Sequence, residues 1–136
     1  MNDTQQLVSV HSLSQVNGLP FGASVADLET LLGTPDEALH NYTGEFEVRY
    51  GECFYRFFDN RFVESTFPDK HRFVVDGVVV LSVFAWLSGL SDTVDKARFR
   101  ISLNKGIAYD YRNPQQGSIT IFEAGRWDQL VLGSPR

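Results

Sequence analysis

Alternation of apolar and charged residues over residues 45–67 limits the possible folds of this chain more than any other feature. Phe46, Val48 and Tyr50 alternate with charged residues, and two further runs follow, separated by the pair Asp59-Asn60. A period of two places apolar side chains on one face of a strand and charged side chains on the other. Asp and Asn together favour a tight turn. The segment is therefore predicted to form three antiparallel strands.

A short helix is predicted just before these strands, over residues 24–32. Ser24 followed by Asp27 has the spacing of a capping box, and apolar residues then recur at helical intervals. Gly33 and the proline that follows it are typical of a helix end. A further strand is predicted from Glu37, so the unit is one helix followed by a four-strand antiparallel meander.

The second half of the chain contains a degraded copy of this pattern. Ser82 stands where Ser24 stands in the first half. Residues 82–90 are compatible with a strand or a helix, and the helical spacing of Phe84, Leu87 and Leu90 favours a helix. Four strands are predicted to follow, at residues 95–103, 107–111, 118–122 and 126–132. Two half-buried meanders can share such alternation by chance, so an internal duplication is a hypothesis.

The predicted fold class is α+β, in a single domain spanning residues 1–136. Two tandem helix-plus-meander units, at residues 20–67 and 78–132, are expected to form one curved sheet with the helices on one face. Residues 68–77 are expected to link the units as part of a hairpin whose turn is Asp76-Gly77. Residues 7–10 are expected to add at most a weak edge strand.

Charge and hydropathy exclude several classes of partner. A net charge of −5 argues against a protein that holds nucleic acid by its phosphates and suits a basic protein partner. The longest apolar run, residues 78–87, is about half the length that spans a bilayer, so no membrane partner is expected. The first residues lack the pattern of a signal peptide, and we expect a cytoplasmic protein.

Chemically reactive residues give little indication of catalysis, and we expect neither an enzyme nor a cofactor. Cys53 is the only cysteine, and it shares the apolar face of its predicted strand with Tyr55 and Phe57, which is typical of a buried thiol. His11, His40 and His71 lack a second ligand at metal-binding spacing. An enzyme that uses Cys53 as its nucleophile remains an alternative, and it predicts that Cys53→Ala abolishes function without loss of stability.

The charged strand faces are the better candidates for function, although such faces are by default only solvated. An aromatic residue beside arginines is typical of interface anchors. The candidate partner-binding residues are Glu47, Arg49, Phe54 and Arg56 in the first half and Arg98, Arg100, Asp110 and Arg112 in the second, with Glu45 and Thr120 on the same expected face.

Two motifs of the first half carry a resemblance to known folds. Gly22-Ala23-Ser24 before the helix and residues 31–36 after it, Leu-Leu-Gly-Thr-Pro-Asp, resemble the repeat of β-lactamase inhibitor protein and of small outer-membrane-assembly lipoproteins. The first resemblance implies a tandem repeat whose joined concave sheet grips a protein. The lack of a lipoprotein signal and of a lipidation cysteine departs from the second group.

The whole chain is also similar to small uncharacterised bacterial proteins. The shared pattern is Pro-Phe-Gly, Leu-Gly-x-Pro, Tyr-Arg-Phe and Gly-Ile-Ala-Tyr-Asp, at residues 20–22, 32–35, 55–57 and 106–110. This resemblance implies an immunity protein that neutralises a toxin by steric blocking. The alternative is a carrier of a small molecule or lipid, with a cavity lined by Tyr50, Tyr55, Trp86 and Tyr109.

Overall fold

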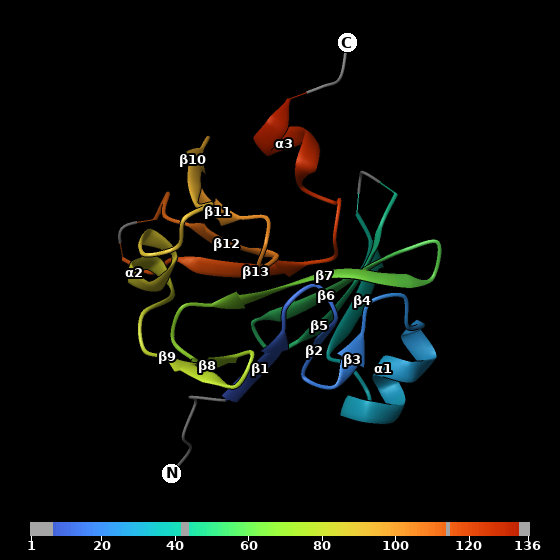
Figure 1. The fold of residues 1–136 in the computed structure, drawn as a ribbon. Helices are drawn as coiled ribbons and strands as arrows, with labels where there is room; N and C mark the ends of the chain where they lie inside the picture. Colours follow the sequence, from blue (N-terminus) through green and yellow to red (C-terminus); the bar gives the residue numbers. More distant parts are fainter. Residues whose placement is uncertain (1–6, 42–43, 114, 134–136) are drawn as a thin grey trace.

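Two β-sheets packed face to face form the molecule, with three short helices around them in the described part of the chain (Figure 1). The computed structural model describes residues 7–41, 44–113 and 115–133. The fold is α+β and mostly strands, as predicted. The prediction of one curved sheet is wrong, because a second sheet of five strands accompanies the larger sheet of eight.

The larger sheet is antiparallel throughout and is built from two meanders. In spatial order its strands are β10 (Val94–Lys96), β11 (Phe99–Ser102), β12 (Ile107–Asp110), β13 (Ser118–Phe122), β7 (Arg61–Pro68), β6 (Cys53–Phe58), β5 (Phe46–Tyr50) and β4 (Glu37–His40). Strands β7 and β13 meet at its centre, with Thr66 opposite Thr120, and we call this junction the seam.

Each meander follows a helix. Helix α1 (Val25–Leu32) precedes β4, and helix α2 (Val83–Ser88) precedes β10. Ser24 caps α1 with the predicted capping box, and the Ser82 hydroxyl accepts a hydrogen bond from the backbone of α2. The order of one helix and four strands therefore occurs in both halves, while their origin by duplication remains a hypothesis.

The smaller sheet combines the N-terminal segment with the central hairpin. Its strands in spatial order are β3 (Leu19–Pro20), β2 (Gln15–Val16), β1 (Leu7–His11), β8 (Arg72–Val75) and β9 (Val78–Val80). Strand β1 pairs in parallel with β8, with Val8 opposite Phe73. The prediction of a weak edge strand is wrong, because β1 lies in the middle of this sheet.

The main core lies between the two sheets. Apolar side chains of β1, β2, β3 and β8 face those of the larger sheet, and Leu28 of α1 and Leu87 of α2 close its margins. The apolar face of the meanders is therefore covered mainly by a second sheet. The largest fully buried side chains of this core include Phe57, Phe62, Phe67, Phe73, Ile119 and Ile121.

Backbone conformation confirms two predicted turns and corrects one predicted strand. Asp59 and Asn60 have φ of 53° and 57°, and Asp76 and Gly77 have φ of 52° and 83°, as two-residue hairpin turns of the mirror-image type require. Ala97 also has a positive φ, of 55°. The predicted strand at residues 95–103 is therefore divided into β10 and β11 by a turn.

The C-terminal segment is a helix, so the strand predicted at residues 126–132 is wrong. Helix α3 (Asp128–Leu132) follows Trp127, whose ring stacks on Phe122 with centroids 5.0 Å apart. Figure 1 shows α3 on the side of the larger sheet opposite the smaller sheet. The expectation that all helices lie on one face is wrong for this reason, because α3 covers its own small cluster with Phe99 and Ile101.

Candidate functional site

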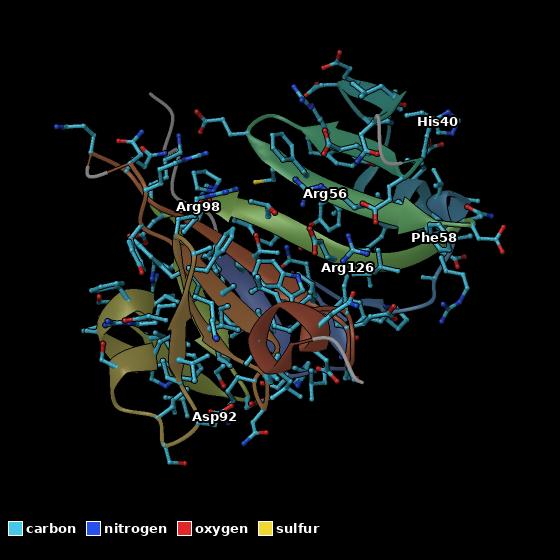
Figure 2. The ribbon with its side chains drawn as sticks, turned by 90° about the horizontal axis from the view of Figure 1, so that it is seen from above. His40, Arg56, Phe58, Asp92, Arg98 and Arg126 are labelled. Carbon is cyan, nitrogen blue, oxygen red and sulfur yellow. The ribbon has the colours of Figure 1, made fainter. Side chains whose placement is uncertain are left out.

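One half of the larger sheet presents a charged face on the side opposite the core. Figure 2 looks onto this side, where α3 lies over the second meander and no described helix lies over β5 and β6. Strand register places charged residues of neighbouring strands directly opposite one another. We call this surface the charged face, and it comprises Glu37, Glu45, Glu47, Arg49, Phe54, Arg56, Glu64 and Thr66 with Arg126 from the segment before α3.

Arg56 is at the centre of the charged face and joins three strands. Its Nε donates to Glu47 Oε2 at 2.9 Å, and its Nη1 donates to Glu64 Oε2 at 2.7 Å and to Thr66 Oγ1 at 2.9 Å. Thr66 in turn is hydrogen-bonded to Thr120 across the seam. Glu47 and Glu64 are only 8% and 7% exposed, so cationic partners such as Arg56 offset the cost of burying these side chains.

Arg126 extends the ion pairs toward the C-terminal segment. Its Nε donates to Glu64 Oε1 at 2.7 Å, and its Nη2 lies 2.8 Å from Glu45 Oε2. Burial alone would lower the pKa of Arg126, but the carboxylates of Glu64 and Glu45 outweigh burial and raise that pKa above its ordinary value. Trp127 Nε1 also donates to Glu64 Oε1, so the start of α3 is fixed to the sheet by polar contacts.

Arg49 and Phe54 form the accessible end of the charged face. The Arg49 guanidinium lies 4.6 Å from the centroid of the Phe54 ring, and its nitrogens lie 3.4 Å from Glu47 and 3.5 Å from Glu37. The Arg49 side chain is 37% exposed, against 18% for Arg56. Arg49 and the still more exposed Glu37, at 56%, are therefore the charged groups of this face that an approaching molecule can reach most easily.

The second-half candidates are divided between the two sides of the sheet. Arg98 pairs with Asp110 at 2.9 Å on the same side as the charged face, and Asp110 also accepts a hydrogen bond from the backbone of exposed Arg112. Arg100 points to the other side, where it is bonded to Asp95 and stacks on Phe84 of α2. The expectation that Arg100 shares the open face is wrong, because the turn at Ala97 changes the phase of the strand.

The sequence did not predict the contacts that tie the charged face to the segment before α3. Glu64, Arg126 and Trp127 hold one another, but they are about sixty residues apart in the chain and Arg126 and Trp127 were predicted to lie in a strand. The available signal was Glu64 itself, because a carboxylate between buried apolar residues of a strand requires a cationic partner. Its partner could not be identified without the tertiary fold.

Two of the cavities away from the charged face contain aromatic residues that were expected to line a carrier cavity. One, of about 330 Å³, is lined in part by Tyr50, Tyr55 and Cys53, and the other, of about 370 Å³, is lined in part by Tyr109. Trp86 lines neither of them. The four aromatic residues expected around one carrier cavity are therefore not brought together.

The lone cysteine lies near a histidine, and burial shifts the pKa values of both groups. Cys53 Sγ is 3.8 Å from His71 Nε2, and burial, with Glu52, raises the pKa of the Cys53 thiol to about 11. Burial, with Lys70, lowers the pKa of His71. At neutral pH the thiol is therefore protonated, whereas nucleophilic catalysis requires the thiolate.

Among the described residues no helix is both long enough and apolar enough to cross a membrane. Comparison of the chain with protein-family models, with curated proteins and with solved structures found no match.

Proposed function

We propose that this chain binds a protein partner through the charged face and inhibits it, as an immunity protein that blocks a bacterial toxin sterically. The observation that carries the proposal is the contrast between the two sides of the first meander. One side is buried under the smaller sheet, while the other is uncovered and still carries an ordered set of charges around Phe54.

Order in the charged face favours recognition of a protein. Arg56 and Arg126 are held by several carboxylates, so their side chains lose little further freedom when a partner binds. Arg49 and Phe54 are stacked and partly exposed, which is the composition of binding hot spots. An ordered polar rim around an aromatic anchor is typical of specific interfaces.

The sign of the charge favours a basic partner. The glutamates of the charged face outnumber its arginines, with Glu37, Glu45, Glu47 and Glu64 against Arg49, Arg56 and Arg126. The chain as a whole has a net charge of −5. A negative potential of this kind accelerates association with a basic protein and discriminates against acidic ones.

A binding measurement with the product of the neighbouring gene tests the proposal. We expect binding by calorimetry and protection of cells in a co-expression toxicity assay. Phe54→Ala and Arg49→Ala should each weaken binding about tenfold or more, which corresponds to about 1.4 kcal/mol, because each removes one half of the stacked pair. Arg72→Ala is the matched control, because Arg72 is exposed on the smaller sheet.

Two results would overturn the proposal. The first is a lack of both binding and protection. The second is an equal loss of binding in Arg72→Ala and in the two variants of the charged face, which would exclude this surface as the interface.

A further inference from the structure

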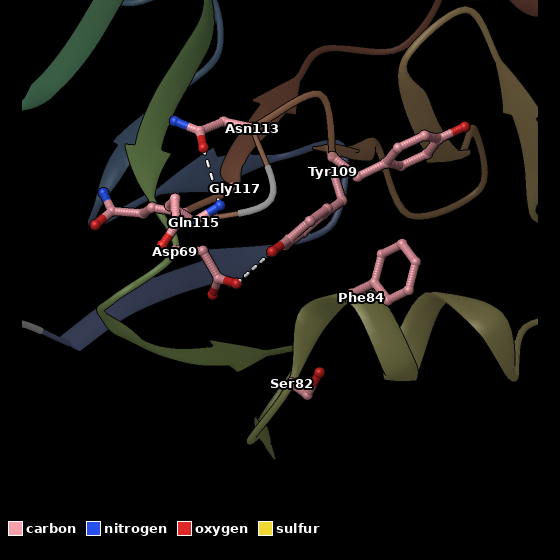
Figure 3. A pocket seen from close by; sticks show the side chains of 9 residues that line it. Asp69, Ser82, Phe84, Tyr109, Asn113, Gln115 and Gly117 are labelled. Atoms are coloured by element: carbon pink, nitrogen blue, oxygen red, sulfur yellow. Dashed lines mark hydrogen bonds between the residues drawn. The ribbon is translucent and has the colours of Figure 1, made fainter.

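The cavity of about 370 Å³ lies between α2 and the loop that joins β12 to β13 (Figure 3). Its volume falls within the range of small-molecule sites, roughly 300–1,000 Å³. Tyr109, which forms part of its wall, is opposite Arg100 in the ladder and so points to the side of the sheet away from the charged face. A ligand here would therefore be independent of the protein partner proposed above.

Three aromatic rings form the apolar wall of this cavity. The centroid of Phe84 is 5.2 Å from that of Tyr109 and 6.0 Å from that of Tyr111, and the ring planes are inclined by 57° and 78°. Phe84 and Tyr111 are partly exposed. Phe84 therefore contacts Tyr111 edge to face and Tyr109 at a tilt, and it joins the two tyrosines into one apolar wall.

The wall is held in place before any ligand binds. Tyr109 donates its hydroxyl hydrogen to Asp69 Oδ2 at 2.6 Å, and burial, with Asp69, raises the pKa of Tyr109 to about 12. A Cβ at Gly117 would lie 2.4 Å from the Tyr109 ring, so the ring rests directly on the backbone of the loop. Side chains fixed in this way bind a ligand with little loss of freedom.

The polar wall offers both donors and acceptors. The side-chain amides of Gln115 and Gln116 have no hydrogen-bond partner among the described residues, and Asn113 uses only its Oδ1, toward the backbone of Gln115. The Ser82 hydroxyl accepts from Ala85 N and retains its own hydrogen to donate. Amides and hydroxyls of this kind complement a ligand whose groups both donate and accept.

Charge in the cavity favours a neutral ligand. Asp69 is the lining residue with a formal charge, and one of its oxygens is already occupied by Tyr109. The nearby guanidinium of Arg100 lies 4.4 Å above the Phe84 ring and forms two bonds to Asp95, so it is not available to hold an anion. It also occupies one face of Phe84, which weakens the site for a second cation.

We propose that this cavity binds a neutral polyhydroxyl compound, one or two sugar rings in size. The apolar face of a sugar ring would pack on Phe84 and Tyr111, while its hydroxyls, which each donate and accept, would pair with Asn113, Gln115 and Gln116. Two features of the same cavity support this ligand: a fixed aromatic wall, and side-chain amides that have no hydrogen-bond partner among the described residues.

Titration of the ¹⁵N-labelled chain with maltose, cellobiose and diacetylchitobiose tests this inference, with tetramethylammonium and inorganic phosphate as charged probes. We expect at least one disaccharide, at millimolar concentrations, to shift the backbone amide signals of Phe84, Gln115 and Gly117. Gln115→Ala and Phe84→Ala should weaken that binding about tenfold. Leu130→Ala, at an exposed position of α3 on the other side of the sheet, is the matched control and should bind normally.

Several outcomes would overturn the inference. They are the absence of shifts at these amides with all three disaccharides, shifts with tetramethylammonium or phosphate alone, and undiminished binding in Gln115→Ala. Gln115 is exposed and its side chain has no described partner, so this variant stays informative even if Phe84→Ala unfolds α2.

Discussion

Replacement of Arg56 by methionine should destabilise the fold much more than a change at a partly exposed residue normally does. Arg56→Met keeps most of the side-chain volume but removes the cation that lies 2.9 Å from Glu47 and 2.7 Å from Glu64. Both carboxylates are nearly buried, and each would lose a charged hydrogen bond. The negative charges of Glu47 and Glu64 would then repel each other within the sheet, because no cation would lie between them.

The magnitude follows from the surroundings of the two carboxylates. Removal of one partner from a fully buried ion pair costs about 3–5 kcal/mol. Here the lower end applies, because Arg56 is 18% exposed and Glu64 keeps its bonds to Arg126 and Trp127. We therefore expect a loss of about 3 kcal/mol, equivalent to a fall in Tm of roughly 10 °C for a domain of this size.

Urea unfolding measures this loss, and we expect a lower midpoint with an unchanged slope. Arg98→Met is the matched control, because its ion pair with Asp110 is 45% exposed on the arginine side and should contribute less than about 1 kcal/mol. The double variant Glu47→Gln/Arg56→Met should recover part of the loss, because it removes one of the two like charges. A loss below about 1 kcal/mol in Arg56→Met, or an equal loss in Arg98→Met, would refute the argument.

Three further predictions concern local features of the fold. Cys53 should react slowly with iodoacetamide at pH 8 in the native chain and rapidly in urea, because its pKa is raised to about 11; equal rates would contradict the burial of the thiol. The lowered pKa of His71 means that the unfolded chain binds protons more readily, so the free energy of unfolding should fall as pH falls below about 6.5. His71→Gln should flatten that pH dependence, with exposed His11→Gln as the control, and an unchanged slope would contradict the assignment. Ser24→Ala should cost about 1 kcal/mol in urea unfolding through loss of the cap of α1, whereas an unaffected midpoint would show that the capping box contributes nothing.

Local patterns predicted the first meander well. The period of two in β5 and β6 and the Asp59-Asn60 turn depend on neighbouring residues only, so they can be recognised in the sequence. The same alternation placed Glu47, Arg49, Phe54 and Arg56 on one face, as the register of the ladder has it. The alternation within each single strand was therefore enough to predict that these four residues share one face.

Long-range pairing accounts for most of the failures. The smaller sheet depends on a parallel ladder between β1 and β8, and nothing in Val8 or Phe73 indicates that they will be neighbours. The short C-terminal helix is fixed by Trp127 on Phe122, a tertiary contact, and its five residues are too few for periodicity to separate helix from strand. The side of the sheet on which Arg100 lies was predicted wrongly because the backbone turns at Ala97. Ala97 has a positive φ, which non-glycine residues rarely adopt, so the sequence gives no sign of this turn.

The seam joins segments that are distant in the chain, which bears on the order of folding. Within each meander every ladder connects consecutive strands, so only short loops must close. Thr66 and Thr120, in contrast, are separated by 54 residues in the chain. Strand β1 likewise pairs with β8, although most of the first half of the chain lies between them in sequence. Because the entropy of closing long loops is lost before their contacts form, the hairpins should form early and the seam late. The rate-limiting step of folding is then expected to be the meeting of two meanders that are already largely built.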